Sequence, residues 1–314
     1  MILIVDVSSL AHRIYHVSHQ NDVNGEPCGV PSGFFRTMAR ITTELKESFL
    51  EPITKVACMD FGRCLWRTEL YPEYKAKRDR PQVTDFAPQM SNLETALPQF
   101  GFQVCKAYGT EADDLIGVVS QELEKNTNEN ICIVSSDKDL WQLITNRVKI
   151  YDLSKDMIVG AKEAEELLGF SHERLVEYKA LAGDSSDNIP GAKGIGEKGA
   201  KKILAEYPNL QEVLDGIRHS IGDEEPDEGI LEGLATPELR KVAKSMGSIR
   251  LAGKLCTIAQ YPDQLWDDTA KDAVSATVQT VINGQTPAFD DVATSILAEL
   301  WRTDGTTWHY AFKS

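Results

Sequence analysis

The sequence predicts an α/β protein whose mostly parallel central sheet is flanked by helices. Short, largely apolar runs alternate along the first half of the chain with longer stretches whose apolar residues recur at helical spacing. The first apolar run, residues 2–5, is uninterrupted, as expected of a parallel strand buried on both faces. Three of the runs end at an aspartate, which suggests a common site at one edge of the sheet.

Run length and periodicity assign each element. Runs of four to eight apolar and β-branched residues suit strands, whereas Phe34, Met38, Ile41 and Leu45 mark one face of a helix. Asn, Asp, Gly and Pro in residues 19–31 indicate a loop. In chain order we expect strand 2–5, a helix with a serine cap at residue 8, helix 32–49, strand 53–60, helix 91–100, strand 102–105, helix 113–123, strand 130–137, a hairpin of residues 149–151 and 157–159, and helices 161–168 and 172–182.

Three expected strands end at Asp6, Asp60 and Asp137. One aspartate after a strand is usually a cap or turn residue. Three such aspartates are harder to explain as caps, because the carboxyl ends of parallel strands lie along one edge of the sheet. Ligands bind at this edge in open α/β sheets. Hard divalent cations prefer oxygen ligands. The sequence therefore predicts a divalent-metal site at this edge.

A second acidic group, Glu111, Asp113 and Asp114, stands at the start of an expected helix. Helix capping accounts for part of it, since Thr110 and Asp113 fit a capping box and acidic residues favour the first turn. Capping does not explain why three like charges crowd one helix end, and a bound cation would relieve their repulsion. Further candidate ligands are Asp139, Asp184 and Asp187, of which the last two could instead cap a helix.

The segment 66–81 interleaves five basic residues with aromatic ones in an otherwise acidic chain. Such a segment suits phosphate contact and base stacking, although a solvated basic surface is an equally good reading of the segment alone. If the segment is helical, Lys75 and Arg78 share a face.

A glycine-rich hairpin is expected between helical runs, at residues 183–199. Residues 194–199 match G-x-G-x-x-G, but no strand precedes them, so we reject a dinucleotide site. Backbone N–H groups and the following helix N-terminus would instead bind phosphate, with lysines nearby. No P-loop pattern is present in the sequence, so nucleotide hydrolysis is not indicated.

Composition is that of a water-soluble globular chain, with 42% hydrophobic and 26% charged residues. No apolar run approaches a membrane span, and the N-terminus does not resemble a signal peptide. The six cysteines have no C-x-x-C spacing and are expected to be reduced core residues of a cytoplasmic protein. The net charge of −15 argues against nucleic acid as a partner unless the acidic residues gather where cations compensate them.

Several motifs together resemble the 5′-nuclease family of flap endonucleases and the N-terminal nuclease domain of bacterial DNA polymerase I. They are Val5-Asp6, Met59-Asp60, Tyr74-Lys75-x-x-Arg78, Glu111-Ala112-Asp113-Asp114, Ser136-Asp137-Lys138-Asp139, Gly183-Asp184-Ser185-Ser186-Asp187-Asn188 and Gly191-Ala192-Lys193-Gly194-Ile195-Gly196. The resemblance implies a PIN-like nuclease core at residues 1–180 with a helical arch at about 66–98. It also implies a helix–hairpin–helix DNA-binding region at 181–260, followed by an extension of unknown role at 261–314.

The resemblance also assigns the site residues. Two Mg²⁺ or Mn²⁺ ions would be held by Asp6, Asp60, Glu111, Asp113 and Asp114 and by Asp137, Asp139, Asp184 and Asp187. The residues expected to neutralise the scissile phosphate are Lys75, Arg78 and Arg13. The residues expected to contact DNA are Arg67, Lys77, Arg80, Gly191, Lys193, Gly194, Gly196, Lys198, Lys201 and Lys202. A K⁺ ion at the hairpin is also implied.

The expected activity is 5′→3′ exonuclease and 5′-flap endonuclease action on flapped, nicked or branched DNA, in replication or repair. A ribonuclease-H-like role on RNA–DNA hybrids and a non-catalytic DNA-binding scaffold are the alternatives. The chain departs from the family at His12, where bacterial relatives often carry tyrosine, and in an acidic insertion at about 219–234. Beyond about residue 261 no counterpart is recognised, a helix is expected at 290–301, and no polymerase domain is expected to follow. A monomeric, stand-alone nuclease of a bacterial or phage-infected cytoplasm is therefore expected.

Overall fold

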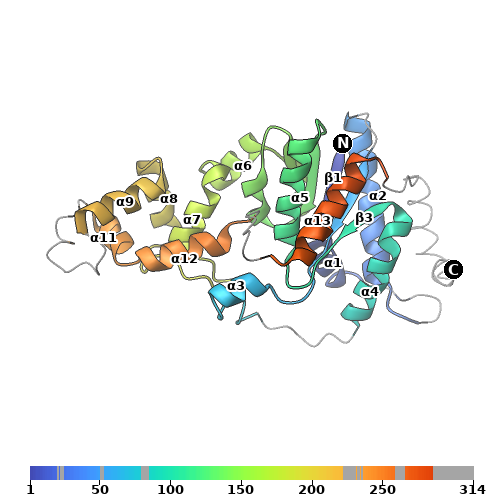
Figure 1. The fold of residues 1–314 in the computed structure, drawn as a ribbon, viewed down its shortest axis with the longest axis horizontal. Coiled ribbons are helices and arrows are strands. Elements are labelled where there is room, and N and C mark those ends of the chain that lie inside the picture. Colours follow the sequence, from blue (N-terminus) through green and yellow to red (C-terminus); the bar gives the residue numbers. More distant parts are fainter. Residues whose placement is uncertain are drawn as a thin grey trace.

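A six-stranded sheet organises the molecule, in the order β3-β2-β1-β4-β5-β6 (Figure 1). The computed structural model describes residues 1–19, 21, 25–49, 53–78, 85–221, 231, 234, 236–258 and 266–285. The strands are β1 (Ile2–Asp6), β2 (Thr54–Cys58), β3 (Phe102–Cys105), β4 (Ile131–Ser135), β5 (Val148–Asp152) and β6 (Met157–Val159). All neighbouring strands are parallel except β5 and β6, which form the expected antiparallel hairpin.

Helices cover both faces of the sheet. Alternate residues of β1 point to opposite faces, and because both sets are apolar, each face must be covered. Ile2 and Ile4 face α5 (Ala112–Asn126) and belong to the same apolar cluster as α13 (Asp268–Ile282). Leu3 and Val5 pack on the other face with α1 (Val7–Tyr15), α2 (Gly29–Phe49) and α4 (Phe86–Ala96). This burial on both faces explains why β1 is apolar along its length until Asp6.

A helical unit extends from one end of this layered part (Figure 1). It contains α6 (Ala161–Leu168), η3 (His172–Arg174), α7 (Leu175–Ala182), α8 (Glu197–Glu206), α9 (Leu210–Ile221), α11 (Pro237–Ala243) and α12 (Met246–Cys256). The remaining short elements are α3 (Leu65–Leu70), η1 (Leu97–Phe100) and η2 (Lys138–Leu143). After residue 266 the chain returns to the sheet, where α13 lies beside α5 and β3 (Figure 1).

The α/β prediction is confirmed, with corrections at individual elements. The helix expected at 91–100 begins at Phe86 and gives way at Leu97 to a 3₁₀ turn that contains Pro98. Residues 72–77 form turns rather than a continuous helix, so Lys75 and Arg78 are not related by helical spacing. Helix α13 was not expected, whereas the helix expected at 290–301 lies outside the described residues. In the described part of the chain, no helix is long and apolar enough to span a bilayer.

Candidate active site

The carboxyl edge of the sheet brings the predicted aspartates together. Asp6 ends β1, while Asp60 and Asp137 follow the neighbouring strands β2 and β4. Asp113 stands in the first turn of α5, which packs against β1. The site therefore arises from four separate segments of the chain, and parallel pairing alone aligns three of them.

Backbone and hydroxyl donors orient these carboxylates. Asp6 caps α1, with Oδ1 accepting from the Ser9 N–H at 2.9 Å and Oδ2 from the Ser135 hydroxyl at 2.8 Å. Asp60 Oδ1 accepts from the Ala112 N–H at 2.7 Å, which ties the end of β2 to the start of α5. Fixed carboxylates of this kind need little reorganisation to bind a ligand.

The charge environment of Asp6, Asp60, Asp113 and Asp137 differs from that of the other predicted ligands. Within the described ranges, no lysine or arginine forms an ion pair with Asp6, Asp60, Asp113 or Asp137. Burial, followed by the charges of Asp60 and Asp137, raises the pKa of Asp6 to about 7. Burial and the charges of Asp6 and Asp137 raise the pKa of Asp113 well above its ordinary value. Asp6 is buried, Asp113 and Asp137 are half-buried, and Asp60 is exposed. Crowded carboxylates that repel one another are a donor set that fits a hard divalent cation.

A lysine bridges two carboxylates of the second predicted group. Lys179 of α7 forms ion pairs with both Asp139 and Asp184, with a 2.7 Å distance between Nζ and Asp184 Oδ2. Burial and the charge of Asp137 raise the pKa of Asp139 to about 6. Although burial opposes it, hydrogen bonds from Lys179 and Ser186 lower the pKa of Asp184 to about 2. One ammonium thus compensates part of the negative charge of Asp139 and Asp184.

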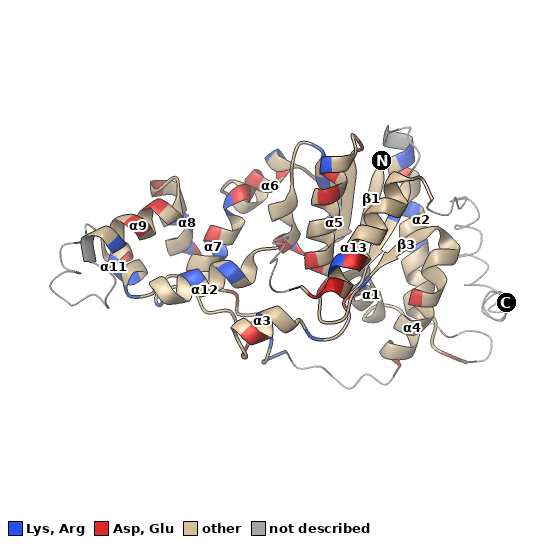
Figure 2. Cartoon of the chain, in the orientation of Figure 1, with Lys and Arg blue, Asp and Glu red and all other residues tan. Residues whose placement is uncertain are grey.

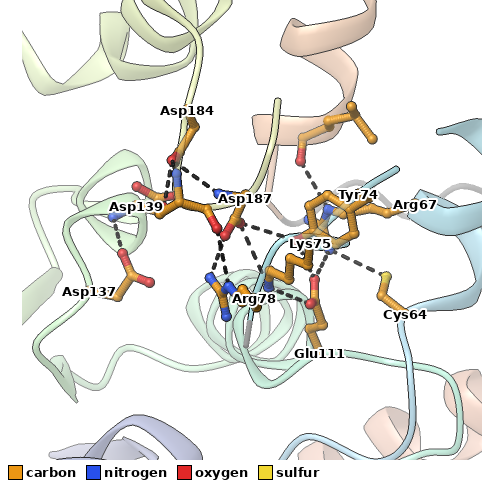
Figure 3. Close-up of polar contacts among 12 residues, drawn as sticks. Cys64, Arg67, Tyr74, Lys75, Arg78, Glu111, Asp137, Asp139, Asp184 and Asp187 are labelled. Carbon is orange, nitrogen blue, oxygen red and sulfur yellow. Dashed lines mark hydrogen bonds and ion pairs between the residues drawn. The ribbon is translucent and has the colours of Figure 1, made fainter. Parts of the chain in front are cut away.

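Lys75 and Arg78 form ion pairs with Glu111 and Asp187, two of the three remaining predicted ligands (Figure 3). The Lys75 ammonium lies 2.5 Å from Glu111 Oε1 and 3.7 Å from Asp187 Oδ2, and Arg78 pairs with Asp187 Oδ1. The buried Tyr74 hydroxyl donates to Glu111 at 2.9 Å and lies 3.4 Å from Asp187 Oδ2. Lys75 and Arg67 outweigh the effect of burial and hold the pKa of Glu111 below its ordinary value.

The backbone around Lys75 is held in an unusual conformation. Lys75 has a φ of 54°, which is uncommon for a residue with a side chain. Its N–H donates to the carbonyl oxygen of Asp187 at 2.8 Å, and Asn188 Nδ2 donates to the carbonyl oxygen of Glu73 at 2.8 Å. The two loops are thereby joined, which brings Lys75 and Asp187 together from positions far apart in the sequence.

Arg67 requires a correction. It was expected to be a DNA contact, but its side chain is only 3% exposed and lies in the interior. Its guanidinium donates two hydrogen bonds to Asp114, at 2.6 and 2.8 Å, and a third to Glu111 at 2.7 Å. Its Nε donates to the Leu255 carbonyl oxygen at 2.9 Å. Arg67 thus joins α3, α5 and α12, and cannot contact DNA from this position.

The same arginine changes the interpretation of Asp114. Cys64, Glu111 and Asp114 place candidate ligand atoms within 4.8 Å of one another. Arg67 Nη1 already lies 2.6 Å from Asp114, 2.7 Å from Glu111 and 3.6 Å from Cys64 Sγ. A guanidinium supplies the positive charge among these three groups, so this cluster is a closed ion-pair network. Asp114 holds Arg67 in this structure, and its expected role as a metal ligand stays a prediction.

The glycine-rich segment forms the expected hairpin between α7 and α8. A Cβ on Gly191 would lie 2.3 Å from the Gly183 nitrogen, so close backbone packing requires glycine there. Gly194 and Gly196 are exposed together with the four predicted lysines, Lys193, Lys198, Lys201 and Lys202. Lys201 and Lys202 also bond within the chain, to the Leu168 carbonyl oxygen at 2.7 Å and to Glu238 at 3.0 Å.

The remaining basic candidates differ in position. Arg13 and Lys77 are exposed, and Arg80 lies outside the described residues. The contacts of three further residues were not foreseen from the sequence. Tyr74 contacts Glu111, Lys179 contacts Asp139 and Asp184, and Lys241 Nζ donates to the Gly194 carbonyl oxygen at 3.1 Å. Tyr74 was part of a recognised motif, whereas no local pattern marks Lys179 or Lys241.

Solved structures with the same fold include a bacteriophage T5 enzyme. T5 5′-exonuclease with bound zinc ions superposes with a TM-score of 0.68 at 20% identity, over 90% of this chain and 98% of that one. The T5 flap endonuclease in a complex with DNA and metal ions gives a TM-score of 0.62 at 20% identity, over 95% of this chain and 99% of that one. At this level of identity the similarity establishes the fold.

Sequence comparisons establish the family. A 5′-3′ exonuclease from Bacillus subtilis is 33% identical over 264 residues, which cover 82% of this chain and 86% of that protein. DNA polymerase I from Rhizobium leguminosarum is 32% identical over 218 residues, or 68% of this chain, but these are only 21% of the polymerase. Residues 1–169 match the N-terminal resolvase-like domain of 5′-3′ exonucleases, and residues 170–263 match their C-terminal SAM fold. The chain therefore belongs to the 5′-3′ exonuclease family.

Proposed function

We propose that this chain is a divalent-metal-dependent, structure-specific nuclease that cuts DNA near a 5′ end or at the base of a 5′ flap. The single observation that supports this most strongly is the group Asp6, Asp60, Asp113 and Asp137, which is crowded, oriented and without a basic partner in the described part of the chain. Relatives named as exonucleases and a T5 flap endonuclease bound to DNA and metal ions support the same assignment.

Two cation positions are proposed. Asp6, Asp60 and Asp113, with Glu111 at their margin, would hold one ion, and Asp139, Asp184 and Asp187, with Asp137 between the groups, would hold the other. Mg²⁺ is the proposed cation, with Mn²⁺ as its substitute, because all the donors are carboxylate oxygens. When bound, such ions supply an activated water and compensate charge on the phosphate.

The chain itself contributes charge and position. Lys75 and Arg78 form ion pairs with Glu111 and Asp187, respectively. Both are proposed to neutralise the charge of the phosphate being cut. Arg13 is a further candidate from α1. The exposed lysines and backbone N–H groups of the 191–202 hairpin are proposed to grip duplex phosphates away from the cut. A K⁺ ion at this hairpin remains a prediction.

The proposal is tested by cleavage of an end-labelled 5′-flap duplex with Mg²⁺ or Mn²⁺. Wild type should cut near the junction, and Asp60→Ala or a chelator should abolish cutting while DNA binding persists. The same assay with an RNA flap and an RNA–DNA hybrid distinguishes a DNA nuclease from an RNA-primer remover. Binding without cleavage by wild type in either metal would overturn the catalytic assignment in favour of a DNA-binding scaffold.

A further inference from the structure

An exposed apolar surface lies beside the carboxylates and has no role in the proposed chemistry. Phe61, Leu65 and Tyr108 are 44%, 43% and 59% exposed. The Phe61 and Tyr108 rings meet edge to face with centroids 5.6 Å apart, and a Cβ on Gly109 would lie 2.6 Å from Leu65 Cδ1. Single exposed apolar side chains are ordinary, but contiguous ones indicate a contact surface.

Backbone hydrogen bonds fix this surface. The Phe61 N–H donates to the Thr110 carbonyl oxygen at 3.2 Å, and the Gly109 N–H donates to the Phe61 carbonyl oxygen at 2.7 Å. The Leu65 N–H donates to the Gly109 carbonyl oxygen at 3.0 Å. Gly62 and Gly109 have φ values of 84° and 78°, which allow the two loops to meet. The backbone of the two loops therefore holds the aromatic pair together.

The same pair of loops carries two of the proposed metal ligands. Phe61 directly follows Asp60, and Thr110 directly precedes Glu111. Consecutive Cα atoms are about 3.8 Å apart, so a ligand on this surface lies within one or two nucleotides of a phosphate at the carboxylates. Lys106 Nζ lies 4.8 Å from the Phe61 ring centroid at the margin of the surface, and it also forms an ion pair with Glu94.

The size and chemistry of the surface indicate its occupant. Three side chains cannot bury the roughly 800 Å² per partner that a stable protein interface needs. A single nucleobase is flat, has apolar faces and stacks on aromatic side chains whatever its sequence. We propose that Phe61, Leu65 and Tyr108, the aromatic platform, receive one unpaired nucleobase of the substrate next to the scissile phosphate. This inference rests on the proposed nuclease function.

The test is a set of equilibrium binding measurements without divalent metal. Fluorescence anisotropy would give the Kd of wild type, Tyr108→Ala and Tyr108→Phe for a 5′-flap duplex, and for the same duplex with one abasic site moved stepwise across the junction. Tyr108→Ala should weaken binding to intact DNA about tenfold, within the range for loss of base stacking, while Tyr108→Phe binds as wild type. At one position of the abasic site, wild type and Tyr108→Ala should bind with the same Kd, because the base that would stack on the platform is missing from that duplex.

A matched control is Leu167→Ala, which removes an exposed apolar side chain of α6 that is 46% exposed. This variant should bind every duplex as wild type does. The platform is disproved if Tyr108→Ala binds intact DNA with the Kd of wild type. It is also disproved if the variant binds more weakly than wild type by the same factor at every abasic position. Wild-type cleavage of the intact flap with Mg²⁺ is scored separately, so the platform can fail while the nuclease assignment stands. Cleavage that fails in wild type overturns the proposed function itself.

Discussion

Asp6 illustrates how a residue placed for binding affects stability. Its side chain is 3% exposed, and burial, followed by the charges of Asp60 and Asp137, raises its pKa from 3.8 to about 7. A carboxyl whose pKa is raised in the folded state stabilises the fold fully only below its unfolded pKa, and this contribution is lost as the pH rises through the folded pKa. Metal-free protein should therefore lose stability from this group between about pH 4 and pH 7.

Asp6→Asn should make the metal-free protein more stable at pH 8, by a few kcal/mol at most, because it removes a buried charge. The amide Oδ1 can still accept from the Ser9 N–H, and Nδ2 can donate to the Ser135 hydroxyl oxygen. Urea unfolding in a chelator would measure this, and the gain should fade toward pH 4. As a control, Asp156→Asn should give no gain at pH 8, because Tyr151 and Arg40 lower the pKa of Asp156. A metal-free Asp6→Asn variant less stable than wild type at pH 8 would contradict the argument.

Lys179 is the second residue whose charge can be tested. Because its ammonium forms ion pairs with Asp139 and Asp184, a metal cation that binds these carboxylates must compete with Lys179. Lys179→Met keeps the length of the side chain and removes the charge, so the weaker of two Mn²⁺ binding events should tighten several-fold. Electron paramagnetic resonance of free Mn²⁺ would measure the affinity, and Lys125→Met, which alters an exposed pair on α5, should leave it unchanged. Weaker Mn²⁺ binding to Lys179→Met would show that the lysine instead organises the site.

At the scale of elements, Arg67 connects three helices through one buried side chain. It bonds to Asp114 and Glu111 at the start of α5 and to the Leu255 carbonyl oxygen of α12, from its own position on α3. Breaking such a buried pair leaves an uncompensated carboxylate in the interior. We infer that these contacts fix the orientation of α3 and so the course of the chain from α3 to Lys75.

Arg67→Met should therefore lower the free energy of unfolding by about 3–5 kcal/mol, measured by urea denaturation. Arg40→Met offers a matched comparison, because Arg40 forms exposed pairs with Glu44 and Asp156 and should cost under about 1 kcal/mol. A loss for Arg67→Met no larger than that for Arg40→Met would show that Arg67 does not hold these helices together.

The elements also explain which predictions succeeded. Strand ends at Asp6, Asp60 and Asp137 follow from local apolar runs, and parallel pairing then brings them to one edge. The conformation at Lys75 could not be predicted in this way, because a φ of 54° depends on the distant Asp187 carbonyl oxygen. Arg67 was misassigned because a basic residue in a basic segment looks exposed until α12 is seen to cover it.

At the scale of the whole molecule, acidic residues gather on the loops and helix ends around the sheet edge, while α11 and α12 carry basic ones (Figure 2). This distribution reconciles a net charge of −15 with a nucleic-acid substrate, since cations would compensate part of the acidic charge. Helix α13 could not be foreseen, because its position depends on the distant surfaces of β3 and α5.

The central claim is that the sheet edge binds divalent cations, and calorimetric titration with Mn²⁺ tests it most directly. Wild type should bind two equivalents, and Asp113→Asn should lose one or bind it at least tenfold more weakly. Glu122→Gln, which alters a carboxylate at the other end of α5 that pairs with Lys125, should match wild type. If wild type binds no Mn²⁺, or if Asp113→Asn and Glu122→Gln both titrate like wild type, the carboxylates at this edge are not a metal site.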